Sequence, residues 1–247
     1  MVCVSVVIPT RNRFAALCAA VRSVQAQRLP RGVGLEVVVV DDASSEPSYT
    51  DGSPLPERPW PVCRVRWSQG TRRRLGYACA GAVRNLGVRA CSGDYVCFLD
   101  DDDAMLPDKV RQQLAFMRRH KVYASWTDAR MGRGTYRGGG DADLARAPRF
   151  IGSRWPDLPV HWGEGSMDAR NPVITSTVML HRRLVWDRVG GFLEDRPMGG
   201  GAAAGGVYLD WNYWQRVCRF GGGMVYLDEP LGYYDLGHAG GQQYGGA

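Results

Sequence analysis

The sequence lacks any long hydrophobic run. Of its 247 residues 45% are hydrophobic, yet the longest apolar runs are strand-sized, far below the ~20 residues needed to span a bilayer. An apolar run at residues 4–8 follows Met1 almost at once, which predicts a first strand in place of a signal peptide. We therefore expect no transmembrane segment and a cytoplasmic protein. The arginine-rich surface leaves open a peripheral attachment at a membrane.

Paired cysteines are also missing. The seven cysteines are an odd number, and no two of them have Cys-x-x-Cys spacing. This pattern argues against a disulfide framework and against a zinc site. Cys97 lies inside an apolar run and Cys18 on the apolar face of a predicted helix, so we expect reduced, buried thiols.

Lysine is nearly absent, with Lys109 and Lys121 as the only two. Arginine therefore supplies the net charge of +6, which suits nucleic acid, a membrane surface or a phosphorylated small molecule. The one dense basic cluster is at residues 72–74, and no basic stripe alternates with aromatic residues. A nucleic-acid partner is thus not expected.

Two common phosphate-binding loops do not occur after the predicted first strand. The residues that follow it, 9–13, contain no glycine, so there is no Gly-x-Gly-x-x-Gly motif, and no Gly-Lys-Ser/Thr loop is present. Both a Rossmann dinucleotide site and a P-loop are disfavoured. Phosphates would have to be bound by a metal ion and by arginine.

Strand and helix patterns alternate through the first half of the chain. The predicted strands are 4–8, 35–40, 62–67, 94–99 and 122–126, and the predicted helices are 13–27, 75–89 and one from 107. The first strands are apolar on both faces, which favours a doubly wound, mostly parallel α/β sheet flanked by helices in a single domain. The second half is less regular, with strands predicted at 173–180, 224–227 and 232–235 and a helix from Asp210.

Four consecutive aspartates, Asp100 to Asp103, end the apolar strand at 94–99. Adjacent carboxylates repel one another, so a positive group has to lie beside them. A divalent cation with hard oxygen ligands meets this need. In extended backbone alternate side chains share a face, so Asp100 and Asp102 would point one way and Asp101 and Asp103 the other. An acidic turn before the helix from Pro107 is the alternative, and it explains one aspartate better than four.

Polar residues also follow two other predicted strands, at 9–12 and at Asp41-Asp42. In a parallel sheet, ligands bind beyond the carboxyl ends of the strands, where these residues and the four aspartates would meet. The Asp42 carboxylate can accept a hydrogen bond from a ribose hydroxyl or a base N–H. A turn or helix cap explains Asp41-Asp42 at least as well.

Several segments together resemble the family 2 glycosyltransferases, which have the GT-A fold. The segments that carry the resemblance are 4–13, 36–44, 82–87, 92–103, 189–192 and 209–216. The match spans roughly residues 2–236. It implies one GT-A-like domain at 1–236, with a nucleotide-sugar-binding half at 1–105 and an acceptor-side half at 106–236, followed by a glycine-rich tail at 237–247.

The resemblance also implies roles for individual residues on the donor side. The residues expected to hold the base and ribose of the donor are Pro9, Thr10, Arg11 and Asp42. Arg84 would lie near the nucleotide, and Asp101 near the ribose or the donor sugar. Asp100 and Asp102 correspond to the Asp-x-Asp motif, with Asp102 the more direct ligand of Mn²⁺ or Mg²⁺.

On the acceptor side, Asp210 matches the catalytic base of the family. Leu209 replaces the glutamate that usually precedes that aspartate, so a neighbouring carboxylate is missing. Asp210 also opens a predicted helix, and N-capping is an alternative role. His238 follows a late block that resembles one ending in a histidine, which implies a further metal ligand.

The implied function is an inverting, metal-dependent transferase that moves a sugar, most simply from a UDP-sugar, to an acceptor hydroxyl. The acceptor, whether glycan, lipid-linked or protein, is not specified by the sequence. A non-catalytic nucleotide-sugar or glycan binding domain is one alternative, and a sugar nucleotidyltransferase is another. The nucleotidyltransferases usually have a glycine-rich loop after the first strand, which residues 9–13 lack.

Overall fold

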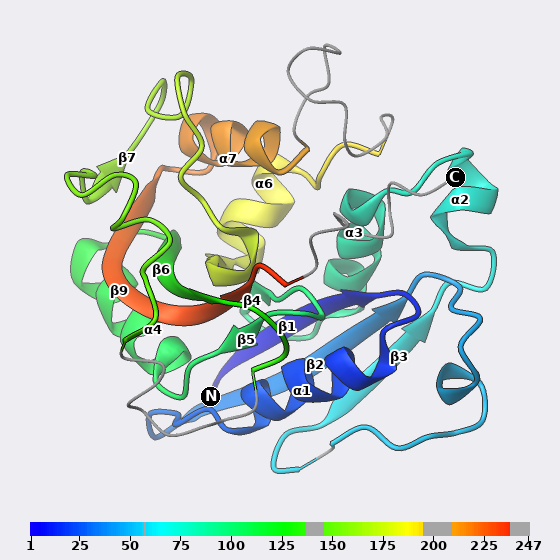
Figure 1. Ribbon diagram of the computed structural model, residues 1–247. Helices are drawn as coiled ribbons and strands as arrows, with labels where there is room; N and C mark the ends of the chain where they lie inside the picture. The colour runs from blue at the N-terminus through cyan, green and yellow to red at the C-terminus, as the bar shows by residue number, and fades with distance from the viewer. Residues whose placement is uncertain (57, 137–145, 195–208, 238–247) are drawn as a thin grey trace.

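The structure is a computed structural model that describes residues 1–56, 58–136, 146–194 and 209–237. Its centre is one β-sheet with helices on both faces (Figure 1). No helix in the described ranges is long and apolar enough to cross a membrane. His238 and most of the predicted glycine-rich tail lie outside the described residues.

The first half of the sheet is parallel. Its strands are β1 (Val2–Thr10), β2 (Val33–Asp41), β3 (Val62–Arg66) and β4 (Tyr95–Phe98), in the order β3-β2-β1-β4. Buried valines lie on both faces of β1 and β2, as parallel strands covered on two sides require. The four strands predicted here are confirmed.

Helices cover the two faces in alternation. The helices α1 (Phe14–Gln25) and α4 (Lys109–His120) pack on the face that carries Val6 and Ile8. The helices α3 (Ala80–Ala90) and α7 (Leu209–Phe220) pack on the face that carries Val7 and Phe98. Because neighbouring strand residues point to opposite faces, this division confirms the predicted doubly wound arrangement.

The second half of the sheet is mixed. It adds β8 (Met179–His181), β6 (Ala124–Gly132), β9 (Met224–Asp235) and β5 (Ala104–Met105) in that order after β4, and β7 (His161–Trp162) pairs with β9. The antiparallel ladders are two or three residues long, whereas the parallel ladders run from four to nine. The sheet is therefore mostly parallel, and β9 curls around its far side (Figure 1).

Three predicted elements differ in the structure. The helix expected at 75–89 begins later, as α3, and a separate helix that the pattern did not predict, α2 (Gly70–Leu75), precedes it and ends at Gly76, which lies in the left-handed region at φ 82°. The strand expected at 173–180 is a short 3-10 turn, η2 (Thr175–Thr177), followed by β8. The strands expected at 224–227 and 232–235 are one strand, β9, whose register against β6 shifts near Pro230.

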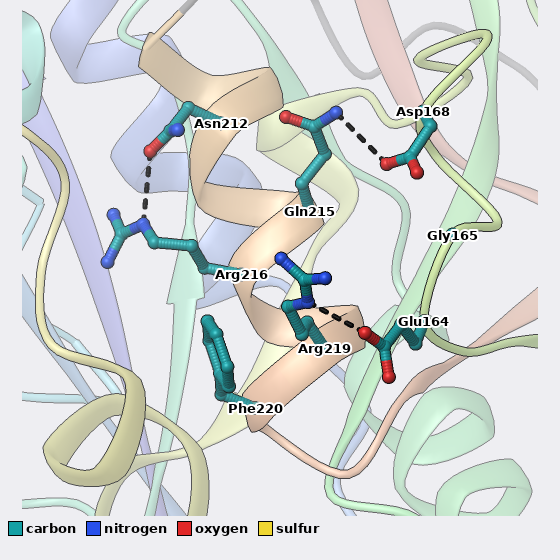
Figure 2. Close-up of a pocket in the computed structure, with 8 residues that line it drawn as sticks. All are labelled: Glu164, Gly165, Asp168, Asn212, Gln215, Arg216, Arg219 and Phe220. Atoms are coloured by element: carbon teal, nitrogen blue, oxygen red, sulfur yellow. Dashed lines mark hydrogen bonds and ion pairs between the residues drawn. The ribbon is translucent and has the colours of Figure 1, made fainter.

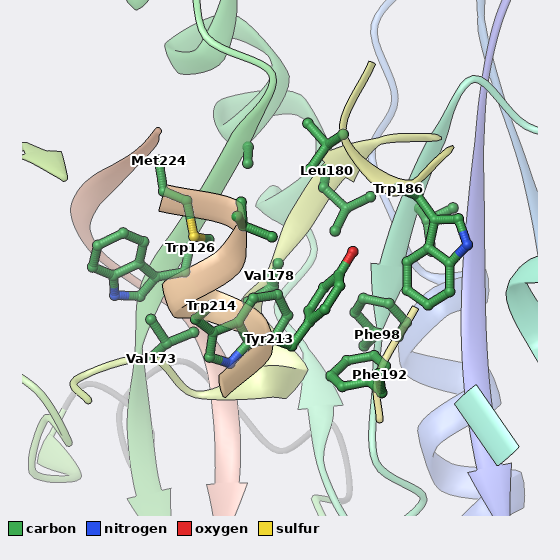
Figure 3. Packing of buried hydrophobic residues seen from close by; sticks show 14 of the residues in the cluster. Phe98, Trp126, Val173, Val178, Leu180, Trp186, Phe192, Tyr213, Trp214 and Met224 are labelled. Carbon is green, nitrogen blue, oxygen red and sulfur yellow. The ribbon is translucent and has the colours of Figure 1, made fainter. Parts of the chain in front are cut away.

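An aromatic cluster fixes the start of α7 over the end of β4 (Figure 3). Tyr213 and Trp214 of α7 are fully buried, and the ring centroids of Tyr213 and Phe192 lie 4.3 Å apart. Phe98 of β4 packs edge-on against Phe192 at 5.4 Å. Buried aromatic pairs of this kind stabilise a core beyond their area alone. The cluster thereby ties residue 210 to the sheet edge where β4 ends.

Candidate functional site

The aspartate run forms a turn at the carboxyl end of β4. The Asp103 N–H donates to the Asp100 carbonyl over 3.1 Å, so the extended backbone expected for these residues is wrong. Exposure still alternates: Asp101 and Asp103 are buried at 6% and 4% exposure, while Asp100 and Asp102 are partly exposed. The turn therefore presents Asp100 and Asp102 toward solvent and holds the other two inside.

Two arginines supply positive charge to this turn. The Arg84 guanidinium, from α3, donates to the Asp100 carboxylate. The Arg13 Nη1 donates to Asp102 Oδ2 over 2.7 Å and to Asp101 Oδ1 over 3.2 Å. The sequence predicted a cation beside the aspartates, and the resemblance implied Arg84 near the nucleotide, but neither assigned a role to Arg13. Arg13 is the last residue of the segment 4–13 that carries the resemblance.

A chain of hydroxyls orients Asp101. The fully buried Thr10 Oγ1 donates to Asp101 Oδ2 over 2.8 Å and lies 2.5 Å from the Tyr49 Oη. Since the single proton of Thr10 goes to Asp101, the Tyr49 hydroxyl donates to Thr10. Tyr49, from the 3-10 turn η1 (Pro47–Tyr49), in turn accepts a bond from the Arg13 N–H over 3.2 Å. The Thr10 hydroxyl is thus committed to the aspartate turn.

Burial changes the charge of the two inner aspartates. Burial, reinforced by the Asp102 carboxylate, raises the pKa of Asp101 to about 7, although Arg13 and Thr10 oppose the shift. Burial also raises the pKa of Asp103 well above its ordinary value. The Asp103 Oδ1 accepts the Asp235 N–H over 3.0 Å, and within the described ranges its Oδ2 has no hydrogen-bond partner. The turn therefore carries less negative charge near neutral pH than four free carboxylates would.

Asp42 lies at the end of β2 and caps a helix. Its fully buried carboxylate accepts from the Thr71 N–H over 2.6 Å and from the Thr71 hydroxyl over 2.7 Å, at the start of α2. The Arg11 Nη1 donates to the Asp42 carbonyl over 2.6 Å and lies 3.9 Å from its carboxylate. Pro9 is buried in the β1–β2 ladder opposite Val40. The two bonds from Thr71 support a capping role for Asp42, and Arg11 lies beside the same carboxylate.

Asp210 lies in the first turn of α7. The helix begins one residue earlier, at Leu209, so Asp210 is not its N-cap. Its Oδ1 accepts the Trp211 N–H over 2.8 Å. Burial raises the pKa of Asp210, Arg84 opposes the shift, and Asp100 adds to it. Asp210 is therefore within electrostatic range of the Arg84–Asp100 pair, although the sequence separates them by more than a hundred residues.

Tyr234 of β9 joins the same region and was not foreseen. Burial raises its pKa to about 12, and the carboxylates of the aspartate run and of Asp210 add to the shift. Its ring packs edge-on against Phe150 at 5.2 Å. Tyr234 was hard to find from sequence because its position depends on the long-range pairing of β9 with β6 and β5.

The residues present fit a divalent cation under one condition. Within the described ranges no three His, Cys, Asp or Glu side chains form a group that could hold a metal alone. Mg²⁺ and Mn²⁺ at nucleotide sites typically use one or two carboxylates together with substrate phosphates. The partly exposed Asp100 and Asp102 are such a pair of hard oxygen donors. Because Arg13 contacts Asp102 at 2.7 Å, the ion would have to displace that guanidinium.

A separate pocket lies on the outer face of α7 (Figure 2). Its cavity is about 220 Å³, and it is lined by Glu164, Gly165, Asp168, Asn212, Gln215, Arg216, Arg219 and Phe220. One of its ion pairs joins Arg219 Nε to Glu164 over 2.8 Å, whereas Arg216 donates to Asn212 and Asp168 accepts from Gln215. None of the residues expected to bind donor or metal lines this pocket, so it is distinct from the aspartate site.

Comparison with known proteins defines the class of the chain. The family model described as glycosyl transferase family 2 matches residues 5–171, about two thirds of the sequence. An uncharacterized glycosyltransferase of Bacillus subtilis, YwdF, is 32% identical over 220 residues, which cover 87% of this chain and 68% of that protein. The chain belongs to glycosyl transferase family 2, a family of transferase enzymes.

Solved structures agree on the fold. Staphylococcus aureus TarS, residues 1–349 in complex with UDP, matches 96% of this chain and 61% of its own at 17% identity and a TM-score of 0.65. The mannosyltransferase PcManGT of Pyrobaculum calidifontis, in complex with GDP-Man and Mn²⁺, matches 96% and 58% at 19% identity and a TM-score of 0.60. The GT-A fold is thereby confirmed. The chain spans 35% or less of the curated relatives from Haemophilus influenzae and two Rickettsia species.

Proposed function

We propose that this chain is a metal-dependent, inverting glycosyltransferase that uses a nucleotide-diphosphate sugar, with a UDP-sugar as donor. The observation that carries the proposal is the Arg84–Asp100 ion pair in the turn that also holds Asp102, with Asp210 in electrostatic range of that pair. The complexes of TarS with UDP and of PcManGT with GDP-Man and Mn²⁺ support the donor class and the metal.

The donor half would hold the nucleotide between the ends of β1, β2 and β4. Arg11, which lies beside Asp42, would contact the base and ribose, and Asp100 and Asp102 would bind Mn²⁺ or Mg²⁺. When bound, such an ion neutralises charge on a diphosphate leaving group. Arg84 adds a fixed positive charge at the same edge. The glycine-free segment 9–13 needs these charges because it offers no phosphate-binding loop.

The acceptor half would supply the base. The Asp210 carboxylate accepts the proton of an acceptor hydroxyl while that oxygen attacks the anomeric carbon. The bond from the anomeric carbon to the diphosphate oxygen breaks as the new glycosidic bond forms, and the nucleoside diphosphate leaves with the electron pair. A single displacement of this kind inverts the anomeric configuration. Burial raises the pKa of Asp210, which strengthens it as a base.

The test is a donor screen with product analysis. The protein would be incubated with Mn²⁺ and each of UDP-, GDP- and dTDP-glucose, -galactose, -N-acetylglucosamine and -mannose, with water as the acceptor, and NMR would follow donor loss and the anomer of the sugar that is released first. Turnover of one donor with inversion is the expected result. Retention of configuration would contradict the direct-displacement mechanism. Binding without turnover of any donor would favour the non-catalytic binding domain.

A further inference from the structure

We propose that Arg13 is a competing cation that keeps a free metal ion off Asp102, so that the site takes up the metal together with a nucleotide diphosphate. The inference rests on the proposed function, since it concerns how the donor and its metal enter that site. Its starting point is the contact of one nitrogen, Arg13 Nη1, with both Asp101 and Asp102.

The pairing is stronger than an ordinary surface ion pair. The side chains of Arg13 and Asp102 are only 16% and 17% exposed, so solvent screens them less than it screens an exposed pair. The 2.7 Å distance to Asp102 is typical of a charge-assisted hydrogen bond. A divalent ion that binds Asp102 alone would have to replace this bond and bring a second cation against the guanidinium.

The two arginines of the site differ in how they are held. The Arg84 guanidinium is buried, bonds Asp100 and lies 5.8 Å from the Phe192 ring centroid. The Arg13 guanidinium has the two carboxylates as its recorded hydrogen-bond partners, and its backbone is fixed separately by the Tyr49 hydroxyl. Arg13 can therefore leave Asp102 by side-chain rotation, whereas Arg84 cannot move without disturbing the core.

A diphosphate changes the balance of charge. It brings anionic oxygens that can bind both a divalent ion and a displaced guanidinium, since arginine and Mg²⁺-type ions both favour phosphate oxygens. Displacement of Arg13 from Asp102 is therefore least costly when ion and diphosphate arrive together. The consequence is weak binding of Mn²⁺ alone and strong coupling between Mn²⁺ and nucleotide affinity.

The test measures Mn²⁺ binding in the absence of nucleotide, and the electron paramagnetic resonance signal of free Mn²⁺ quantifies the unbound ion. Three proteins separate charge from shape: wild type, Arg13→Gln and Arg13→Lys. We expect Arg13→Gln to bind Mn²⁺ about tenfold more tightly than wild type, the value of one charge-assisted bond, and Arg13→Lys to stay close to wild type. With saturating UDP, the difference in Mn²⁺ affinity between Arg13→Gln and wild type should become smaller.

Two further variants control for side effects. Arg219→Gln removes the arginine that pairs with Glu164 in the outer pocket of α7, and it should leave Mn²⁺ affinity unchanged. When Asp102 is already replaced by Asn, adding Arg13→Gln should no longer increase the affinity for Mn²⁺. Thermal unfolding of each variant shows whether it is folded, and in Arg13→Gln the carboxylate of Asp101 keeps its bond from Thr10.

The outcomes are distinct. Equal Mn²⁺ affinity of folded wild type and Arg13→Gln, with Mn²⁺ still binding in the presence of UDP, would overturn the role of Arg13 and leave the proposed function intact. Absence of Mn²⁺ binding in every variant, with and without UDP, would overturn the metal dependence of the proposed function and the role of Arg13 with it. A gain that persists in the double variant would show that Asp102 is not where the two cations compete.

Discussion

On the proposed donor side of the site every carboxylate of the aspartate run accepts a hydrogen bond from an arginine, a hydroxyl or a backbone N–H. On the proposed acceptor side, Asp210 accepts one hydrogen bond within the described residues, from the N–H of the next residue, and Leu209 stands where a second carboxylate is usual in the family. The donor side is thus preorganised by contacts between distant strands and helices. The acceptor side depends on one carboxylate placed by a helix end.

The difference follows from the way the two sides are built. The proposed donor side uses the ends of the parallel strands β1, β2 and β4, which pair side by side and end at one edge. The acceptor side uses α7 and β9, which the aromatic cluster and short antiparallel ladders hold against that edge. We therefore expect changes on the donor side to alter binding and stability, and changes at Asp210 to alter the rate of transfer alone.

The largest effect is expected from Asp210→Asn. Loss of the general base should lower kcat about 10²- to 10⁴-fold, while the affinity for UDP and Mn²⁺ stays within about twofold. Asp168→Asn, in the outer pocket of α7, is the matched control and should keep wild-type kcat. If Asp210→Asn lowered nucleotide affinity as much as kcat, the division between the two sides would not hold.

A smaller effect is expected on the proposed donor side, from Asp102→Asn. Removal of one charged ligand should weaken UDP binding in Mn²⁺ about ten- to hundredfold, as measured by calorimetry. In EDTA the variant and wild type should bind UDP alike. Asp108→Asn, at an exposed ion pair with Arg28 and Arg111, should match wild type in both buffers. A loss of affinity that is equal with and without metal would assign Asp102 a structural role.

The pH dependence of transfer should report Asp210. Because burial raises its pKa above the ordinary aspartate value, the acid limb of kcat/KM should begin at a higher pH than a solvent-exposed aspartate would give. The base acts only when ionised, so the rate should fall by about tenfold per pH unit below that pKa. An acid limb at the ordinary aspartate pKa would show that the carboxylate is not desolvated in solution.

The smallest effects concern stability and compare matched hydroxyls. Thr10→Val leaves the buried Asp101 with one hydrogen bond fewer and should lower the free energy of unfolding by about 1–3 kcal/mol. Tyr49→Phe removes the hydroxyl that bonds Thr10 and should cost about 1 kcal/mol. Tyr234→Phe, on the acceptor side, removes a hydroxyl with no recorded hydrogen bond and should stay within about 0.5 kcal/mol. Urea unfolding at constant pH measures all three free energies. A Tyr234→Phe effect as large as that of Thr10→Val would contradict the difference in stability expected between the two sides of the site.

Local pattern predicted much of the donor half because its strands are long and apolar on both faces. The positions of Asp42 and Asp100 at strand ends followed from that pattern, and Arg84 and Asp210 from the resemblance. Arg13 and Tyr49 could not be found in the same way, because their contacts join segments separated by up to ninety residues. The roles of the predicted site residues remain predictions.

Some errors came from local chemistry that the sequence did contain. Gly76 after the arginine cluster was a stop signal for α2, and the left-handed conformation there needs glycine. The two late strands expected at 224–227 and 232–235 are one strand, because β9 continues through Pro230 with a shifted register. The turn at Asp100–Asp103 was treated as extended because the strand pattern before it is strong, although four aspartates favour a turn.

The measurement that most directly tests the account is calorimetric titration of UDP into the wild-type protein, with Mn²⁺ and then with EDTA, alongside GDP and dTDP. The account predicts that UDP binds in Mn²⁺ and that this binding is lost in EDTA, because Asp100 and Asp102 would hold the metal ion that neutralises the diphosphate. Equal binding in both buffers, or no binding of any nucleotide in either, would contradict a metal-bound donor site at the aspartate turn.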